Sequence, residues 1–238
     1  LKARMEVDDE SALQNLQAGI IASFPHGILS VHHLMLSTDM CGFASRFPRL
    51  VFRRRDLAAS VTFAIPLLRE LLLAIGSIDA TKAVASKALR SGFSLFILPG
   101  GEMEQMLTQE HRQLVYLRRR KGFCRLALEH NAPVVPTYCF GETSLYRVHS
   151  FLLKLRLQIC KSLHIALPMF SGRWGFVPRG SLYLAVGKPI HFESPASSGK
   201  PTVEEVERAH AIFCRELKNL YDSHKARAGF PDEELRIV

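Results

Sequence analysis

The chain has 238 residues, of which 47% are hydrophobic, enough to build the core of one domain. Lys and Arg number 31 against 22 Asp and Glu, which gives a net charge of +9. The five cysteines show neither a Cys-x-x-Cys pair nor the Cys/His spacing of a zinc site, and their odd number argues against a disulfide framework, so we expect a reducing compartment and no metal.

The positive charge is concentrated in two runs, Arg53-Arg54-Arg55 and Arg118-Arg119-Arg120-Lys121. Such clusters attract phosphate on a membrane surface, a phosphorylated cosubstrate or a nucleic acid, and a solvated charged face is the alternative. No nucleic-acid-binding motif is present, and most aromatic residues stand in apolar runs rather than between cations. We therefore expect no nucleic acid partner.

The N-terminal residues 1–16 are polar and acidic, which indicates a helix or a lead-in of the chain. The sequence begins with Leu1 rather than Met and shows no secretory signal, so we expect an N-terminal part, such as a membrane anchor, to be missing. We expect residues 1–238 to form a single domain, with 1–16 as its lead-in.

The apolar run 18–22 predicts a buried strand, which Pro25 and Gly27 end sharply. Residues 28–36 favour a helix packed on that strand, so His26 is expected in the strand-to-helix turn. Open α/β sheets bind ligands at such turns, and an imidazole of near-neutral pKa can take a proton from a hydroxyl. The alternative is a histidine that only caps the helix.

Residues 57–75 are almost wholly apolar, but Pro66 and the pair Arg69-Glu70 interrupt them. Because adjacent charges and a proline disfavour a bilayer interior, we expect a buried or membrane-grazing helix rather than a spanning one. Ser77 or Asp79 is then expected to cap the next helix.

Beyond this run, predicted strands and helices alternate, which indicates an α/β fold with a mainly parallel central sheet flanked by helices. The strands are expected at residues 93–98, 113–117, 133–138 and 181–186, and the helices at residues 80–90, 121–130 and 201–226. The polar segment 194–200 predicts a surface loop.

The segment 151–167 interleaves apolar residues with cations, among them Lys154, Arg156 and Lys161. Residues 154, 158 and 161 share one helical face, although 153–159 also alternates as a strand would. A basic amphipathic helix of this kind is a candidate for lying on a membrane, and packing against the core is the alternative.

Four short segments stand in order along the chain. They are Pro25-His26-Gly27, Pro99-Gly100-Gly101-Glu102-Met103-Glu104, Arg120-Lys121-Gly122-Phe123 leading to Phe140-Gly141-Glu142, and Val186-Gly187-Lys188-Pro189-Ile190. Together they resemble the diacylglycerol acyltransferase 2 family, which includes monoacylglycerol and wax-alcohol acyltransferases, over roughly residues 15–225.

The resemblance has one departure at the histidine motif. The family's usual motif is His-Pro-His-Gly, and here Phe24 replaces the first histidine while His26 matches the second. A His-x-x-x-x-Asp arrangement does not start at His26, because Val31 holds the position of the aspartate. The acid partner of the imidazole is therefore open.

The resemblance implies a lysophospholipid-acyltransferase-like fold with membrane-associated apolar helices. It implies an enzyme on the cytosolic face of the endoplasmic reticulum that moves a fatty acyl group from acyl-CoA to a diacylglycerol, a monoacylglycerol or a long-chain alcohol, in triacylglycerol synthesis. Acyl-CoA is a cosubstrate, no cofactor is expected, and a homo-oligomer is allowed. A glycerol-phosphate-type acyltransferase and a non-catalytic lipid-binding protein are the alternatives, the latter supported by Phe24.

The expected chemistry needs a base, donors for an oxyanion and contacts for CoA phosphates. His26 is expected as the base and Glu104 as a second catalytic residue, while a first-turn carboxylate that complements the helix dipole is the alternative for Glu104. The substrate-binding candidates are Phe24, Pro25, Gly27, Gly100, Gly101, Arg120, Lys121, Gly122, Phe123, Arg125, Phe140, Gly141 and Glu142.

Among these candidates, backbone N–H groups of Gly100 and Gly101 are expected at the oxyanion or at phosphates, and an ordinary tight turn is the alternative. Arg120, Lys121 and Arg125 are expected to hold CoA phosphates. No Gly-x-Ser-x-Gly pentapeptide occurs, which argues against an α/β serine hydrolase and favours direct transfer without a covalent intermediate.

Overall fold

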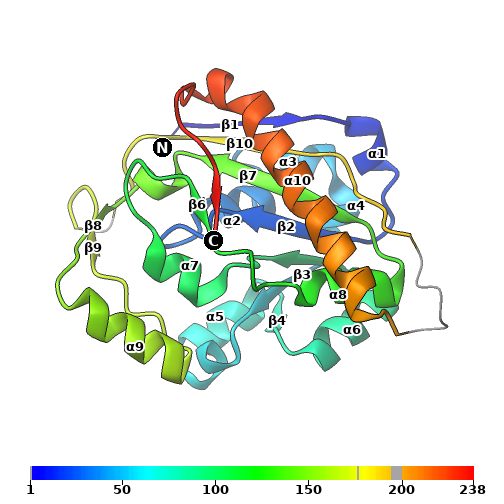
Figure 1. The fold of residues 1–238 in the computed structure, drawn as a ribbon, viewed down its shortest axis with the longest axis horizontal. Coiled ribbons are helices and arrows are strands. Elements are labelled where there is room, and N and C mark those ends of the chain that lie inside the picture. Colours follow the sequence, from blue (N-terminus) through cyan, green and yellow to red (C-terminus); the bar gives the residue numbers. More distant parts are fainter. Residues whose placement is uncertain (1, 176, 194–199) are drawn as a thin grey trace.

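The computed structural model describes residues 2–175, 177–193 and 200–238, so the loop predicted at 194–200 lies outside the described residues apart from Lys200. Its centre is a seven-stranded sheet with the strand order β1-β10-β7-β2-β5-β3-β4. All neighbouring pairs are parallel except β10 with β7. The predicted α/β fold with a mainly parallel sheet is therefore confirmed (Figure 1).

Most predicted elements are confirmed, with ends that differ by a few residues. The sheet strands are β1 Lys2–Val7, β2 Ile20–Phe24, β3 Arg54–Ala58, β4 Ser77–Asp79, β5 Ser94–Ile97, β7 Val134–Phe140 and β10 Ser181–Val186. Two small pairs flank it, β6 Leu114–Val115 with β11 Arg236–Ile237 and β8 Arg147–Val148 with β9 Phe170–Ser171.

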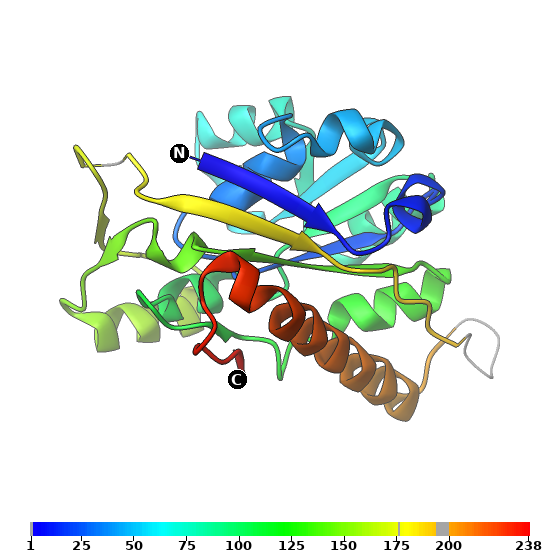
Figure 2. The same cartoon turned by 90° about the horizontal axis from the view of Figure 1, so that it is seen from above.

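Helices cover both faces of the sheet, as Figure 2 shows with α10 on one side and α2 to α4 on the other. One face packs against α6 Lys82–Arg90, α8 Gly122–His130 and α10 Val203–Ala228. The other packs against α1 Glu10–Gln14, α2 Val31–Ser37, α3 Phe43–Arg46 and α4 Pro48–Phe52.

The burial of both sheet faces explains why the central strands are apolar without alternation. In β2, Ile20, Ala22 and Phe24 belong to the cluster beneath α8 and α10, whereas Ile21 belongs to the cluster beneath α2 and α3. The strand is buried along its whole length.

The prediction of a helix or lead-in at the N-terminus is wrong for residues 2–7. They form the edge strand β1, paired in parallel with β10 from Lys2 opposite Ser181 to Val7 opposite Val186. Ala3, Met5 and Val7 pack on the core between polar neighbours, the alternation of a half-buried strand.

The prediction of one helix over 57–75 is also wrong. Leu57 and Ala58 complete β3, a 3₁₀ turn η1 follows at Ser60–Ala64, and α5 spans only Leu68–Ala74 beyond Pro66. Proline at that position ends the turn because it cannot donate a backbone hydrogen bond. No residue of α5 is buried, and Leu67 is 84% exposed, so this part of the apolar run is not buried by the described chain.

The predicted cap of the following helix also needs correction. Ser77 and Asp79 lie in β4 rather than at a helix cap, and Thr81 stands before α6 with its N–H donating to Asp79 Oδ1 at 2.7 Å. The helix expected in 151–167 is confirmed as α9 Leu153–Leu163, and the strand alternative for 153–159 is not. Among the described residues, none of the helices combines the length and apolar character needed to cross a bilayer.

Candidate active site

Three neighbouring parallel strands bring the sequence motifs to one edge of the sheet. The order β7-β2-β5 places the end of β2, which leads to His26, between the ends of its two neighbours. β5 leads through Pro99 and Gly100 into α7 Gly101–Leu107, and β7 leads to Gly141 and the 3₁₀ turn η2 Glu142–Ser144. Because the strands are parallel, their carboxyl ends meet, which is where such sheets bind ligands.

The hydrogen bonds of the His26 ring fix its tautomer. Nδ1 lies 3.1 Å from the carbonyl oxygen of Gly27, which can only accept, so Nδ1 carries the proton. Ser30 Oγ donates to the His26 carbonyl oxygen at 2.8 Å and lies 3.1 Å from Nδ1, where it acts as an acceptor. The lone pair is thus on Nε2, the atom that a general base would use.

The pKa of His26 is lowered to about 4, chiefly because burial disfavours the charged imidazolium. The Gly27 carbonyl opposes this shift by stabilising the charged ring. At neutral pH the ring is therefore uncharged and its Nε2 can accept a proton. The predicted position of His26, in the turn between a buried strand and a helix, is confirmed.

Glu104 holds the main chain of the His26 turn rather than its ring. Its Oε1 accepts the backbone N–H of His26 at 2.5 Å, and its Oε2 accepts that of Tyr116 at 2.6 Å. Only 1% of the residue is exposed, and burial raises the pKa of its carboxyl to about 7. The structure therefore places Glu104, expected as a second catalytic residue, as a positioning residue for the His26 backbone.

Two glycines make room for buried glutamates. A Cβ on Gly100 would lie 2.2 Å from Glu104 Oε2, and a Cβ on Gly27 would lie 2.6 Å from Glu142 Cγ. The N–H of Gly101 donates to the Leu98 carbonyl at 3.0 Å, as in an ordinary tight turn. The turn alternative thus accounts for Gly101, whose N–H is not directed at a substrate, while the role of the Gly100 N–H stays a prediction.

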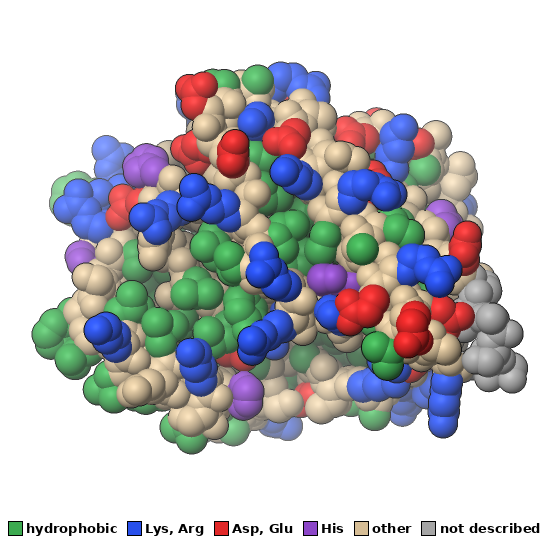
Figure 3. Space-filling model, viewed as in Figure 1, with side chains coloured by type: hydrophobic (Ala, Val, Ile, Leu, Met, Phe, Trp, Pro, Cys, Tyr) green, Lys and Arg blue, Asp and Glu red, His purple; other side chains and the backbone are tan. Residues whose placement is uncertain are grey.

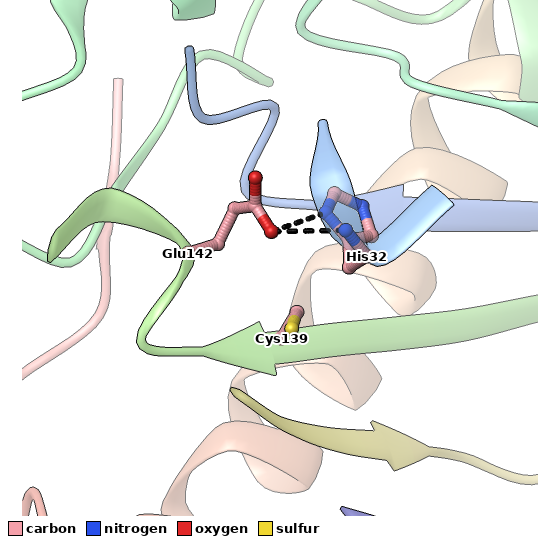
Figure 4. A group of neighbouring side chains, drawn as sticks. All are labelled: His32, Cys139 and Glu142. Carbon is pink, nitrogen blue, oxygen red and sulfur yellow. Dashed lines mark hydrogen bonds and ion pairs between the residues drawn. The ribbon is translucent and has the colours of Figure 1, made fainter. Parts of the chain in front are cut away.

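Glu142 joins the end of β7 to the first turn of α2. Its Oε1 accepts the N–H of Val31 at 2.8 Å, and its Oε2 accepts that of His32 at 3.0 Å and lies 3.2 Å from His32 Nδ1. Figure 4 shows the carboxylate and the imidazole pointing toward each other beside Cys139 on β7. Glu142 was expected to bind substrate, but protein groups occupy both of its oxygens.

The donor atoms of His32, Cys139 and Glu142 lie within 4.8 Å of one another, a composition that could hold a metal ion. Two features of the donor set argue against this use. The carboxylate already accepts two backbone N–H groups, and burial holds the pKa of the Cys139 thiol well above its usual range, so the thiolate that binds metals is disfavoured. The cluster fits a buried histidine–carboxylate pair better than a metal centre.

The three predicted phosphate-binding cations do not converge. Arg120 lies at the glycine turn, 3.2 Å from Glu102 Oε1 and over the ring of Tyr116 at 5.3 Å. Lys121 instead pairs with Glu207 of α10, and Arg125 Nη1 donates to the Pro201 carbonyl at 3.4 Å. Gly122 is the first residue of α8, and a Cβ added there would meet no atom within 4 Å among the described residues.

The aromatic candidates belong to the core. Phe24 and Phe123 both pack against Phe213 of α10. The ring centroid of Phe213 lies 6.0 Å from that of Phe24 and 4.8 Å from that of Phe123. Phe140 stacks on Tyr221 at 5.0 Å. Pro25 follows a cis peptide bond and is buried, and the carbonyl of Ser181 would lie 2.3 Å from a Cβ on Gly141. These candidates therefore contribute to core packing and to the shape of the turns.

Sequence reasoning missed the residues that hold the turn. Ser30 fixes the ring of His26, and Gln105 Nε2 donates to the Ile28 carbonyl at 2.6 Å. The only signal was the position of Ser30 on the turn that follows His26, which a single sequence does not distinguish from other loop serines.

The basic run at 53–55 is also not a free surface patch, because Arg54 pairs with Asp56 at 2.9 Å and is largely buried.

Comparison with known proteins identifies the chain as a whole. The model of a family described as "Diacylglycerol acyltransferase" matches residues 4–238. The chain belongs to this family. The resemblance inferred from the four motifs is thereby confirmed, and the match includes residues 4–7 of the edge strand β1, which the motifs did not reach.

The relatives carry names from the same enzyme class. The chain is 31% identical over 233 residues to "Diacylglycerol O-acyltransferase 1" of Eremothecium gossypii, covering 92% of this chain and 50% of that protein. It is 30% identical over 235 residues to "2-acylglycerol O-acyltransferase 1" of Bos taurus, covering 92% and 68%. The chain thus spans about half the length of the fungal family member.

A solved structure supports the fold. The 1-acyl-sn-glycerophosphate acyltransferase PlsC from Thermotoga maritima superposes with a TM-score of 0.52 at 17% identity, covering 92% of this chain and 72% of that one. At this identity the likeness shows the α/β fold alone.

Proposed function

We propose that this family member transfers a fatty acyl group from acyl-CoA to the hydroxyl of a diacylglycerol, a monoacylglycerol or a long-chain alcohol, with His26 as general base. The observation that carries the proposal is the His26 ring, whose proton is fixed on Nδ1 at the edge where three parallel strands end. The names of the relatives supply the acylglycerol acceptors, and the long-chain alcohol comes from the resemblance of the four motifs.

The chemistry follows from this geometry. Nε2 of His26 takes the proton of the acceptor hydroxyl while the oxygen attacks the thioester carbonyl carbon, and a tetrahedral oxyanion forms. The carbon–sulfur bond then breaks, and the departing CoA thiolate takes the proton from Nε2. The Gly27 carbonyl stabilises the imidazolium between these steps, because it accepts the Nδ1 proton.

Arg120 is proposed as the CoA phosphate contact nearest the reacting groups, because it alone of the three cations lies at the glycine turn. Lys121 would bind phosphate only after leaving Glu207 of α10, and Arg125 only after leaving the Pro201 carbonyl. Phe24 lies in the core against Phe213, so its presence in place of a histidine removes nothing from the contacts of the His26 ring, and this weakens the non-catalytic alternative.

We further propose that the protein acts at a membrane, at the cytosolic face of the endoplasmic reticulum, because an acceptor such as diacylglycerol does not readily leave a bilayer. Neither a cofactor nor a metal enters the proposed steps.

The proposal is tested by incubating the purified chain with labelled acyl-CoA and a panel of acceptors dispersed in detergent. We expect labelled acylglycerol or wax ester that requires both substrates. A panel that includes lysophosphatidate and glycerol phosphate distinguishes the nearest alternative. If the chain transfers acyl groups only to these phosphorylated acceptors, the proposed acceptor class is wrong, and if it transfers to none, the catalytic proposal fails.

A further inference from the structure

The connection between β8 and β9, together with the residues just beyond it, exposes large apolar side chains. Phe151 is 65% exposed, Leu155 50%, Leu163 61% and Trp174 91%. We call the exposed part of residues 151–174 the α9 surface. Figure 3 shows hydrophobic side chains gathered at the lower left, where α9 lies in Figure 1, with Lys and Arg among them.

The charge around this surface has a single sign. From Thr143 to Phe192 the sequence contains no Asp or Glu, although it contains seven Lys and Arg residues. Lys154 and Lys161 are exposed on α9 itself. The carboxylates that reach this region from other elements are engaged, Glu102 with Arg120 and His164 and Glu110 with the N–H of Val148.

Arg156 has a different role from its neighbouring cations. Sequence analysis grouped it with Lys154 and Lys161, but only 6% of it is exposed. Its guanidinium donates to the carbonyls of Phe151, Leu167 and His149 at 2.9, 3.0 and 2.7 Å. It therefore ties the chain before and after α9 to the helix, which fixes the frame from which the apolar side chains project.

This frame adjoins the candidate active site. α9 packs on α7, where Cys160 Sγ lies 3.7 Å from Met103 Sδ and His164 Nδ1 lies 3.4 Å from Glu102. α7 also carries Glu104, whose carboxylate holds the His26 turn. Figure 1 shows α7 and α9 on the side where β2 and β7 end. A bilayer against the α9 surface would thus lie beside the edge that holds His26.

We propose that the α9 surface docks on an anionic lipid bilayer, with its apolar side chains in the interface and its lysines on anionic head groups, so that a lipid acceptor reaches His26 from that side. The inference deepens the proposed function and rests on it for the direction of acceptor entry. A bilayer is favoured over a second copy of the chain because the segment that forms the surface has basic but no acidic residues, and two such surfaces would repel each other. Cations and apolar side chains together are the recognised requirement for interfacial binding.

The sequence provides its own reporter, because Trp174 is the single tryptophan of the chain. The 238-residue protein would be mixed with vesicles of phosphatidylcholine, with and without phosphatidylserine, and followed by sedimentation and by tryptophan emission. We expect co-sedimentation with the anionic vesicles, a blue shift of the emission and protection from acrylamide quenching. Binding to neutral vesicles should be weaker.

Two variants and a matched control locate the contact. Leu155→Glu with Leu163→Glu should weaken binding to anionic vesicles ~10-fold or more, because two apolar contacts are lost and two negative charges face the lipid. Lys154→Gln with Lys161→Gln should weaken binding to anionic vesicles only. Phe52→Glu, at an 86% exposed residue of α4, should bind as the parent does.

Each contrary result overturns the proposal. Absence of binding to anionic vesicles does so, as does binding without any change in Trp174 emission, or loss of binding in Phe52→Glu with the α9 variants unaffected. A dimer in solution that Leu155→Glu dissociates would assign the surface to a second copy. Acyl transfer to a detergent-dispersed acceptor needs no bilayer, so it tests the proposed function separately. A protein that binds vesicles but transfers no acyl group counts against the proposed function. A protein that transfers acyl groups but does not bind vesicles counts against this inference.

Discussion

His26 is one of ten histidines in the chain, and its neighbours distinguish it from the others. Its Nδ1 proton is committed to Gly27 and Ser30, which leaves Nε2 as the basic atom. We expect His26→Ala to lower kcat/KM by about 10² to 10⁴ without unfolding the protein, because a general base contributes rate rather than packing. Acyl transfer at matched protein concentration measures this, with the exposed His191→Ala as control, and activity within a few-fold of the parent would exclude His26 as the base.

Glu142 should matter for stability before it matters for turnover. Its carboxylate is shared among two backbone N–H groups and the buried His32 ring, so Glu142→Gln places an amide N–H₂ where an acceptor is needed. We expect a loss of about 3 to 5 kcal/mol in the free energy of unfolding, typical of breaking a buried pair. Urea denaturation measures it, and the surface variant Glu204→Gln should change the same quantity by less than about 0.5 kcal/mol. A parent-like midpoint for Glu142→Gln would contradict the role assigned to this carboxylate.

Glu104 predicts a pH dependence of stability with a definite sign. Its pKa in the folded protein is raised to about 7 from 4.5, so between these values the folded state binds more protons than the unfolded state. The contribution of Glu104 is therefore fully present below pH 4.5 and is lost as the pH rises through about 7. His26 acts in the opposite direction, because its folded pKa of about 4 lies below its ordinary 6.5, so its contribution is lost as the pH falls.

The test uses Glu104→Gln, which cannot titrate. The free energy of unfolding of the parent minus that of the variant should decrease from pH 5 to pH 8 when measured by urea denaturation. Taking the difference between the two proteins cancels the contribution of His26. A difference that stays constant or increases over this range would show that the Glu104 pKa is not raised.

At the scale of elements, Arg156 determines whether α9 stays attached to its flanks. Arg156→Leu leaves three backbone carbonyls without their donor. We expect faster proteolysis and faster amide exchange within residues 149–167, and a loss of about 3 kcal/mol or more where those carbonyls remain buried. Mass spectrometry of limited digests locates the cuts. Lys154→Leu, at an exposed residue of α9, serves as control. Equal digestion of the two variants would show that Arg156 does not hold the chain before and after α9 in place.

Elements that are buried along most of a strand or along one helical face were predictable from the sequence. β7, β10 and α8 follow from an apolar run or a helical stripe that ends at a turn residue, and each is confirmed within a few residues. The prediction of one helix over 57–75 was wrong because hydrophobicity alone does not show whether other residues cover a segment. Leu67 in this run is 84% exposed. The grouping of Arg156 with the surface cations was wrong for a different reason. Its partners are backbone carbonyls that only the folded turns around α9 bring together.

The candidate site shows the same division. The position of His26 follows from local sequence, because a strand, a proline and a glycine stand side by side. The two carboxylates that hold its turn come from residues 104 and 142, and they reach it only because β5 and β7 flank β2. Strand order is a non-local property that no short motif contains, so the roles of Glu104 and Glu142 could not be derived before the sheet was known.

For the molecule as a whole, we expect direct transfer that needs neither a metal nor a covalent intermediate. Burial raises the pKa of the Cys124 and Cys139 thiols above their usual range and that of Cys214 to about 11, so these thiols are poor nucleophiles at neutral pH. Turnover should survive a chelator, and rapid quench with labelled acyl-CoA should leave the protein unlabelled. An acyl-protein adduct that forms and decays at the rate of turnover would refute direct transfer.

The pairing of β1 with β10 has a consequence for how the chain is made. Lys2 lies opposite Ser181, and Val7 lies opposite Val186, so β1 must wait for β10, which is the last strand of this sheet in chain order. At about 5 to 20 residues per second, this delay is roughly 10 to 40 s. During that time β1 is a nascent strand without its template, open to chaperones and to other chains. Closing the edge of the sheet is therefore a late event of synthesis, and a ribosome stalled before residue 181 would hold the site-forming strands β2, β5 and β7 with β1 still unpaired.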